Sequence, residues 1–156
     1  MNHSPSHDHQ HCIDNALDRA QAICLQRGRK FTAIRQRVLT LIWNSHEPIS
    51  AYDILDLLSE NKKRVAPPTV YRALDFLLHE GFIHRIESLN AYVGCSDPEH
   101  SHNGYLLICN KCNQVTEILD DLFSDAFKAI TERYGHSCED KIIEISGVCR
   151  SCHATA

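Results

Sequence analysis

Apolar residues recur at helical spacing through most of the first half of the chain. The first run starts near Ile13 and closes at Gly28, because positions three and four apart share one helix face and glycine often follows a helix end. Thr32 is a suitable N-cap for a second run, and Ser50 is a suitable N-cap for a third. The pattern therefore predicts three helices in the first 60 or so residues.

A fourth helical run begins at Pro-Pro-Thr, residues 67–69, since proline is tolerated in a first helical turn, and it ends at Gly81. Two extended runs follow at 82–88 and 91–95, and Leu89–Asn90 joins them. This arrangement indicates a β-hairpin. Several helices, the last of which leads into a two-stranded hairpin, are typical of a winged helix-turn-helix.

The second half alternates between strand and helix patterns. Strands are predicted at 105–109, at 114–119 and at 141–149, and an amphipathic helix is predicted at 121–135. The apolar side of that helix is expected to contain Leu122, Phe123, Ala126, Phe127 and Ile130. A unit of about 50 residues has a thin core, so it usually needs a metal or a partner chain.

These patterns predict an α+β protein with two folded domains. The segment at 96–104 is rich in turn residues, which marks it as the hinge between them. The expected division is a disordered His-rich tail at 1–12, a winged-helix domain at 13–95, the hinge at 96–104 and a small α/β domain at 105–156.

Charge distinguishes the two halves. Residues 1–95 carry 11 basic against 10 acidic side chains, whereas residues 96–156 carry 5 against 10. The basic residues also cluster, at 27–30, at 62–64 and at Arg35 and Arg37. This clustering favours an anionic partner for the first domain, although a solvated helix surface explains the charges equally simply.

The chain shows neither an 18-residue apolar run nor a secretory signal pattern at its start, so we expect an intracellular protein without a membrane span. Thiols stay reduced in that setting. The eight cysteines therefore suggest metal binding or catalysis more than a disulfide framework.

The fourth predicted helix has the features of a DNA reader. Its apolar stripe is buried, which turns Thr69, Tyr71 and Arg72 outward in the first turn, the part of a recognition helix that meets base edges. Arginine reads guanine, and tyrosine or threonine contacts phosphate or a thymine methyl. The alternative is an ordinary surface helix in a protein-interaction domain. A single small reader gives limited specificity, so we expect a two-fold dimer on a palindrome.

Four cysteines form two C-x-x-C pairs: Cys109 with Cys112, and Cys149 with Cys152. Four thiolates in a tetrahedron suit Zn²⁺ in a closed, structural site. The 36 residues between the pairs exceed the usual ribbon spacing, but a strand–helix–strand unit fits there. The rival is a redox dithiol, which usually opens a helix after a strand, and neither pair shows that context clearly.

A looser group of metal-binding residue types lies between the hairpin and the quartet. Its members are His84, Cys95, His100, His102 and Glu117. Convergence of three or four of them on one ion would link the two domains. Each also has a plain structural explanation, as a satisfied wing residue, a small apolar filler, solvated loop residues or a strand-edge charge.

The segment PPTVYRALDFLLHEGFIHRIES, together with CNKC and the late CRSC, resembles the ferric uptake regulator family, and its zinc uptake regulator branch most closely. The resemblance extends from about residue 14 to residue 152. It implies a cytoplasmic, metal-dependent transcription factor with an N-terminal winged helix, a hinge and a C-terminal dimerisation domain. It implies a repressor that binds double-stranded operator DNA of zinc-uptake genes as a homodimer, with no small-molecule substrate beyond the metal.

The resemblance also assigns roles to residues. Cys109, Cys112, Cys149 and Cys152 match the structural zinc site of the family. His84, Cys95, His102 and Glu117 match the regulatory zinc site, which makes two zinc ions per chain. Tyr71 and Arg72 match the recognition helix, and Tyr52 matches a further position near DNA. The histidine-rich run of the iron-sensing branch is reduced here to Glu-His-Ser-His, which leaves His100 without a role.

The ligand set favours zinc within the family, because the Cys95 thiolate suits Zn²⁺ better than Fe²⁺ or Mn²⁺. An iron- or manganese-responsive regulator and a constitutive zinc-stabilised winged-helix protein are the alternatives. A zinc hydrolase, with His84, Cys95 and His102 as ligands and Glu117 as base, would need a substrate cleft that no sequence feature indicates. We therefore expect a regulator and not an enzyme.

Overall fold

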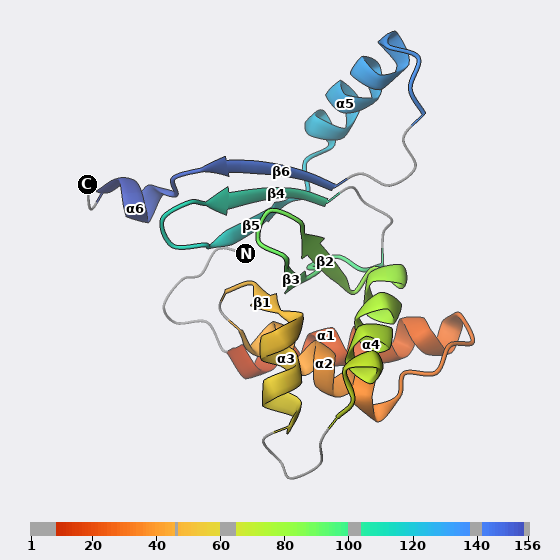
Figure 1. Ribbon diagram of the computed structural model, residues 1–156. Helices are drawn as coiled ribbons and strands as arrows, with labels where there is room; N and C mark the ends of the chain where they lie inside the picture. Colours follow the sequence, from red (N-terminus) through yellow and green to blue (C-terminus); the bar gives the residue numbers. More distant parts are fainter. Residues whose placement is uncertain (1–8, 46, 60–64, 100–103, 138–141, 155–156) are drawn as a thin grey trace. The chain divides into compact units, whose positions relative to one another are not determined.

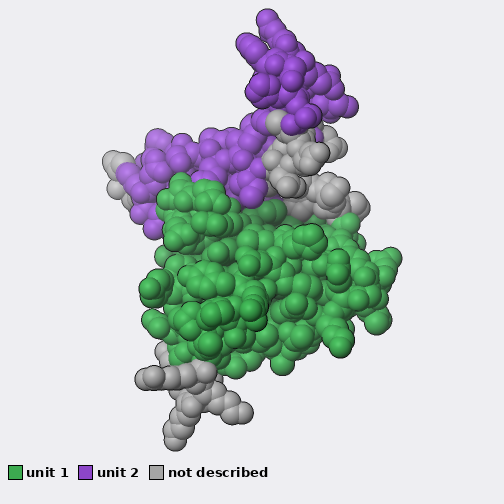
Figure 2. Space-filling model, turned by 45° about the vertical axis from the view of Figure 1, so that its right-hand side comes forward, with its two compact units in different colours: residues 1–100 green, residues 101–156 purple. Residues whose placement is uncertain are grey.

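The computed structural model describes residues 9–45, 47–59, 65–99, 104–137 and 142–154. The chain forms two compact units, residues 1–100 and residues 101–156, which Figure 2 shows in different colours. Each unit contains helices and its own three-stranded sheet. Among the described residues, no helix is both long and apolar enough to cross a membrane.

The first unit is a winged helix-turn-helix (Figure 1). Four helices accompany a three-stranded antiparallel sheet with the order β1-β3-β2, and β1 lies between α2 and α3 in the chain. The helices are α1 (His9–Gln26), α2 (Ala33–Asn44), α3 (Ala51–Ser59) and α4 (Pro67–His79), and the strands are β1 (Ile49–Ser50), β2 (Ile83–Ile86) and β3 (Ala91–Gly94).

Local chemistry sets the ends of the two helices of the helix-turn-helix. Ser50 and Asp53 form a capping box before and within α3: the Asp53 N–H donates to Ser50 Oγ at 3.1 Å, and the Ser50 N–H donates to Asp53 Oδ2 at 3.3 Å. Helix α4 starts with two prolines, and Gly81 follows its end with φ of +79°. Thr32 takes the predicted N-cap position of α2, but its side chain makes no capping hydrogen bond.

One hydrophobic core joins the helices to the wing. Helix α4 contributes the predicted stripe, of which Val70, Leu74 and Leu77 are almost completely buried. Helix α2 packs against it with Val38 and Leu39. Because this face of α4 is fixed inward, its opposite face is held in solvent.

The structure differs from the sequence prediction in two places in this unit. Residues 9–12 belong to α1 instead of the disordered tail, and the exposed Gln10 and Asp14 are hydrogen-bonded across one helical turn at 3.0 Å. The hairpin has a third strand, β1, whose Ile49 pairs with Tyr92. A two-residue strand is too short to show the alternation by which strands are recognised in a sequence.

The division between the two units, after residue 100, lies within the segment 96–104 that was expected to be the hinge. The unit extends through residue 100, so residues 96–99 of the expected hinge belong to it. Arg19 of α1 donates a hydrogen bond to the carbonyl of Ser96 at 3.3 Å, which ties this segment to the helices. Residues 1–8 and 100–103, which include the rest of the expected tail and hinge, lie outside the described residues.

Part of the basic cluster has a structural role. Glu80, at the C-terminal end of α4, has a side chain only 4% exposed, and it lies 3.0 Å from Arg27 and 3.4 Å from Arg29. Arg35 stacks on the ring of Phe76, with its guanidinium carbon 3.4 Å from the ring centroid. Three of the clustered cations therefore make contacts within the first unit, and the single carboxylate of Glu80 neutralises part of their charge.

The second unit is a small α/β layer. Its strands are β4 (Gly104–Cys109), β5 (Val115–Ile118) and β6 (Ile142–Gly147), and its helices are α5 (Asp121–Arg133) and α6 (Arg150–Ala154). The sheet order is β5-β4-β6, in which β4 pairs antiparallel with β5 and parallel with β6. The three predicted strands and the predicted helix are present, whereas the short α6 was not expected.

Among the described residues, part of the apolar side of α5 is exposed. Phe123, at its start, contacts Tyr105 of β4 with ring centroids 4.5 Å apart. Farther along, Ile130 and the following Tyr134 are 57% and 71% exposed. Figure 1 shows the helix leading away from the edge of its own sheet. Ile130 is therefore on the predicted apolar side of α5 but is exposed in this chain, whereas Phe123 and Phe127 are partly buried.

Candidate metal centres and nucleic-acid interface

The four cysteines of the two C-x-x-C pairs converge in the second unit. Each offers its Sγ, and the four sulfurs all lie within 4.8 Å of one another. Cys112 Sγ and Cys149 Sγ are 3.8 Å apart, which is too long for a disulfide and matches the edge, about 3.8 Å, of a tetrahedron with Zn–S bonds of about 2.3 Å. The quartet therefore fits a closed Cys₄ zinc site.

Backbone geometry explains how the first pair is presented. Cys109 ends β4, and its N–H donates to the carbonyl of Gln114 at 2.9 Å across the turn. Asn113 closes that turn with φ of +54°, a conformation that asparagine tolerates better than most residues. The tight turn directs both thiols of the first pair to one side.

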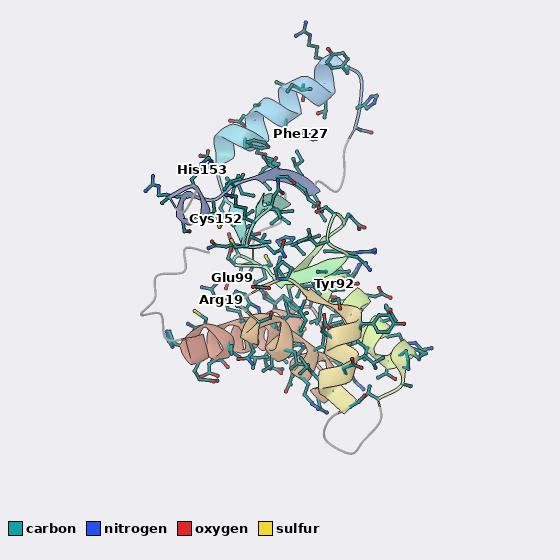
Figure 3. The ribbon with its side chains drawn as sticks, turned by 60° about the vertical axis from the view of Figure 1, so that its left-hand side comes forward. Arg19, Tyr92, Glu99, Phe127, Cys152 and His153 are labelled. Carbon is teal, nitrogen blue, oxygen red and sulfur yellow. The ribbon has the colours of Figure 1, made fainter. Side chains whose placement is uncertain are left out.

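The parallel pairing of β4 with β6 brings the second pair to the first. Cys109 pairs with Gly147, and Asn110 donates its N–H to the Gly147 carbonyl at 2.8 Å. Cys149 follows two residues later, and its N–H donates to Cys109 Sγ at 3.3 Å. Cys152 lies on α6, next to His153 (Figure 3). The sheet register thus bridges the unusually long spacing between the pairs.

Hydrogen bonds favour the thiolate form at two of the four sulfurs, because they lower the pKa of both Cys109 and Cys149. The pKa of Cys109 is lowered to about 6, first by the hydrogen bond from the Cys149 N–H and then by those from Cys112 and Lys111. The pKa of Cys152 is raised to about 12, chiefly because of the neighbouring Cys149 and Cys112 sulfurs. Four thiolates repel one another without a cation, and a divalent cation removes that repulsion.

One sequence argument against a redox pair fails. Cys149 follows strand β6 and directly precedes α6, so the second pair does have the strand-to-helix context of a redox dithiol. The sequence missed this because α6 has only five residues. The convergence of four sulfurs, instead of two, is the observation that favours metal over redox chemistry. Ser151 Oγ, 3.4 Å from Cys149 Sγ, is a polar neighbour that no motif indicated.

His84 and Cys95 form a second pair of metal-binding residue types, within the first unit. His84 lies on β2 opposite Val93, and Cys95 follows two residues after Val93, so both side chains share one face of the sheet. One ring nitrogen of His84 and the sulfur of Cys95 lie within 4.8 Å of each other. The residues are 9% and 2% exposed. A buried imidazole next to a buried thiol suits a borderline-soft cation.

The other two residues of the predicted regulatory set belong to the second half of the chain. Glu117 lies on β5, opposite Leu106 of β4, and is partly buried. His102, like His100, falls outside the described residues.

The predicted DNA-contacting residues are on the surface of the first unit. Thr69, Tyr71 and Arg72 are exposed in the first turns of α4, where Tyr71 is 47% exposed. Tyr52, in the first turn of α3, is 75% exposed. Both aromatic side chains are therefore accessible to a partner on the surface of the first unit.

The fold and the quartet define a class: a winged-helix protein with a second α/β unit in which four cysteines converge. The profile described as the ferric uptake regulator family matches residues 26–146. The zinc uptake regulation protein of Escherichia coli (strain K12) is 40% identical over 137 residues, which cover 87% of this chain and 80% of that protein. The chain belongs to the ferric uptake regulator family.

Two further comparisons extend this assignment. The ferric uptake regulation protein of Legionella pneumophila is 31% identical over 128 residues, covering 80% of this chain and 92% of that protein. A solved structure described as a zinc uptake regulator complexed with zinc and DNA superimposes with a TM-score of 0.85, at 38% identity, covering 92% of this chain and 96% of its own.

Proposed function

We propose that this protein is a zinc-responsive transcriptional repressor that acts in the cytoplasm on the operators of zinc-uptake genes. The observation that carries the proposal is the likeness to the zinc uptake regulator solved with zinc and DNA, which spans 92% of the chain. The lower identity to a ferric uptake regulation protein, 31% against 40%, supports zinc over iron. A regulator, and not an enzyme, is what membership of the family supports.

Two zinc ions per chain are proposed. Cys109, Cys112, Cys149 and Cys152 hold the first, and bound zinc supplies a rigid tetrahedral link between the β4–β5 turn and the start of α6. A closed set of four thiolates leaves no coordination position open, so this site is structural. A small unit with exposed apolar side chains needs such a link for its stability.

The second ion is the regulatory one. His84 and Cys95 are proposed to hold it together with Glu117 and His102, a set carried over from the family resemblance. Burial supports the first two as ligands. A histidine and a cysteine that are already shielded from water can bind a metal without further loss of their own hydration. The thiolate of Cys95 is the donor that favours Zn²⁺ over Fe²⁺ or Mn²⁺.

DNA recognition is assigned to the outward face of the helix-turn-helix. Arg72 and Tyr71 are proposed to approach base edges from the start of α4, while Thr69 and Tyr52 contact the backbone. The buried stripe of α4 keeps that face outward without any contribution from DNA. The proposed DNA-contacting face of α4 is therefore already formed in the absence of DNA.

A homodimer is proposed because the second unit exposes apolar side chains that a second copy would cover. They are Leu107, Leu119, Ile130, Tyr134 and Ile142, each more than 40% exposed. Dimerisation places two readers on one palindrome, which raises specificity beyond what one small module provides.

Regulation is proposed to follow a population shift. The regulatory ligands bind zinc more tightly in the arrangement that suits both half-sites, so zinc raises the affinity for DNA. By linkage, operator DNA must raise the affinity for zinc by the same factor. This reciprocity distinguishes a sensor from a constitutive zinc-stabilised DNA-binding protein, which shows no coupling.

Three variants test the proposal. Cys95→Ser should bind one zinc ion instead of two, stay folded and lose the zinc-dependent gain in operator affinity. Cys24→Ala, which removes another buried thiol of the same unit, serves as the matched control. It should keep both zinc ions and the zinc-dependent gain in operator affinity. Cys112→Ser should instead lose the structural ion. Zinc stoichiometry and DNA-binding titrations with zinc and a chelator measure these effects.

Normal zinc-dependent DNA binding by Cys95→Ser would contradict the assignment of the regulatory site. Tighter retention of Fe²⁺ or Mn²⁺ than of Zn²⁺ in a metal-competition titration would favour the alternative sensor within the family.

A further inference from the structure

The wing, which is the hairpin of β2 and β3, carries an arginine that its neighbours hold only loosely. Arg85 lies on β2, an edge strand because the sheet order is β1-β3-β2. Its side chain is 41% exposed, and its Nη2 atom lies 3.3 Å from Asn90 Oδ1 and 3.3 Å from Glu87 Oε2. Charge-assisted hydrogen bonds are usually about 2.7–2.9 Å long, so neither contact fixes the guanidinium firmly.

The adjacent nitrogen of the same guanidinium lacks an acceptor. Arg85 Nε is buried and donates no hydrogen bond to any residue that the structure describes. Nε and Nη2 form one edge of the planar guanidinium, and such an edge donates two parallel hydrogen bonds to a carboxylate or a phosphate. Within the described part of the chain, this edge therefore meets single, long contacts at one nitrogen where an oxyanion would satisfy both.

The strand register places Arg85 on the face of the sheet that meets the helices. Arg85 pairs with Tyr92 of β3, and paired residues of antiparallel strands share a face. Tyr92, labelled in Figure 3, is 6% exposed and belongs to the same core as Leu74 and Leu77 of α4. His84, one position earlier on β2, is on the opposite face because side chains alternate along a strand. The arginine is therefore on the helix side of the wing, and the proposed zinc ligand is on the other side.

Electrostatics relate Arg85 to the proposed DNA-contacting face of α4. Burial raises the pKa of the Tyr92 hydroxyl; the positive charge of Arg85 acts against this rise, and Asp75 and Tyr71 of α4 add to it. The Tyr92 hydroxyl is thus within electrostatic reach of both Arg85 and the exposed Tyr71. A duplex that meets Tyr71 at its base edges presents backbone phosphates at the borders of the groove. The wing arginine extends the cationic surface toward such a border.

We propose that Arg85 binds a backbone phosphate of the operator and exchanges the carboxylate of Glu87 for that phosphate when DNA binds. This inference rests on the proposed function as a DNA-binding regulator, and it adds a contact from the wing. Asn90 is a positioning residue, because its side-chain oxygen accepts a hydrogen bond from the guanidinium at the turn of the hairpin. The exchange costs little, since Glu87 is 66% exposed and an exposed ion pair adds little stability.

A phosphate contact has a measurable signature. Each neutralised phosphate contributes about 0.9 to the slope of log affinity against log salt concentration. A homodimer carries two copies of Arg85, so loss of the contact should make this slope less steep by about 1.8, which is twice 0.9. The affinity should fall by the same factor for the operator and for unrelated DNA, because a phosphate carries no sequence information. Loss of a base-reading residue instead reduces the preference for the operator.

The test uses the full-length protein at saturating zinc, an operator duplex selected from a random-sequence pool, and a shuffled duplex of the same length and composition. Arg85→Gln should weaken binding to both duplexes by about tenfold or more at low salt and reduce the salt slope by about 1.8. Arg85→Lys keeps the charge but not the two-donor edge, so it should keep most of the slope. Glu87→Gln should tighten binding to both duplexes, because it removes the carboxylate that competes with phosphate.

Two control variants accompany these measurements. Arg37→Gln removes one positive charge from an exposed arginine of α2 in the same unit, and it should leave the salt slope unchanged. Arg72→Gln tests the proposed base reader of α4, and it should lower the ratio of operator affinity to shuffled-duplex affinity. Zinc stoichiometry is measured for every variant, because Arg85 is next to His84 in the chain.

Several outcomes would overturn the inference. They are unchanged affinity and slope in Arg85→Gln, an equal effect of Arg37→Gln, and loss of the second zinc ion from Arg85→Gln, which would place the effect at the metal site. If Trp43 fluorescence shows that Arg85→Gln is unfolded, Glu87→Gln decides: tighter binding supports the inference, and unchanged or weaker binding overturns it.

Failure of the proposed function gives a different result. The wild-type protein would then show no zinc-dependent preference for any selected duplex. If the wild type shows that preference and Arg85→Gln matches it in affinity at every salt concentration, the inference fails alone.

Discussion

The buried carboxylate of Glu80 allows a quantitative prediction about the reading helix. It lies at the C-terminal end of α4, is 4% exposed, and contacts Arg27 at 3.0 Å and Arg29 at 3.4 Å. Arg27 also donates to the Glu80 backbone carbonyl at 3.0 Å. The arginine side chains are 42% and 56% exposed, so only the carboxylate depends on the protein for its solvation.

This asymmetry determines the expected energies. Glu80→Ala frees two arginines that water can solvate. We therefore expect the free energy of unfolding to fall by only about 1–2 kcal/mol, because solvent screens the exposed arginines. Arg27→Ala removes one hydrogen bond to the Glu80 carboxylate and one to the Glu80 carbonyl. The buried carboxylate then keeps only the longer contact with Arg29, so we expect the free energy of unfolding to fall by about 2–3 kcal/mol. The double variant should resemble Glu80→Ala, with a coupling of about 1 kcal/mol or more.

Urea unfolding monitored by Trp43 fluorescence measures these values, because the single tryptophan lies in the first unit. Arg37→Ala, which removes an exposed cation from the same basic region, is the control and should change stability by less than about 0.5 kcal/mol. The reasoning is refuted if Arg27→Ala costs less than Glu80→Ala, or if the two losses simply add in the double variant.

Three further predictions concern packing, capping and metal. Gly94→Ala should destabilise the first unit by about 1–3 kcal/mol and shift Trp43 emission in the same urea unfolding assay, because the new methyl group would overlap the indole ring; unchanged stability and emission would contradict this close packing. Ser50→Ala should cost about 1 kcal/mol, since it removes the acceptor for the Asp53 N–H; equal stability of Ser50→Ala and wild type in urea would exclude the capping role. Cys112→Ser should make the second unit sensitive to protease while the Trp43 signal of the first unit persists, and resistance equal to that of wild type would argue against a structural metal.

Local rules in the sequence were sufficient for most of the elements. The stripe of Val70, Leu74 and Leu77 predicts both the existence of α4 and its buried face, because helical periodicity depends only on spacing. Proline and glycine mark its two ends for equally local reasons. The two C-x-x-C pairs likewise predict a site for a soft metal from residue type and spacing alone.

Other features depend on contacts between distant segments, which spacing does not encode. The β1 strand exists only because Ile49 meets Tyr92, and the helical context of Cys149 depends on a five-residue helix that has no pattern of its own. The basic cluster at 27–30 reads as a surface for anions in the sequence, yet the buried Glu80 neutralises part of it.

The sequence by itself determined the helices of the first unit and the residue types of the candidate metal ligands, because these follow from local periodicity and residue chemistry, and its motifs carried the resemblance to the family. Tertiary structure decided which of those ligands meet: the parallel register of β4 with β6 brings four thiols within 4.8 Å across a 36-residue gap. It also decided that Arg27 and Arg29 meet the buried carboxylate of Glu80. Both depend on packing of segments far apart in the chain, where chain folding, and not spacing, sets the distance between side chains.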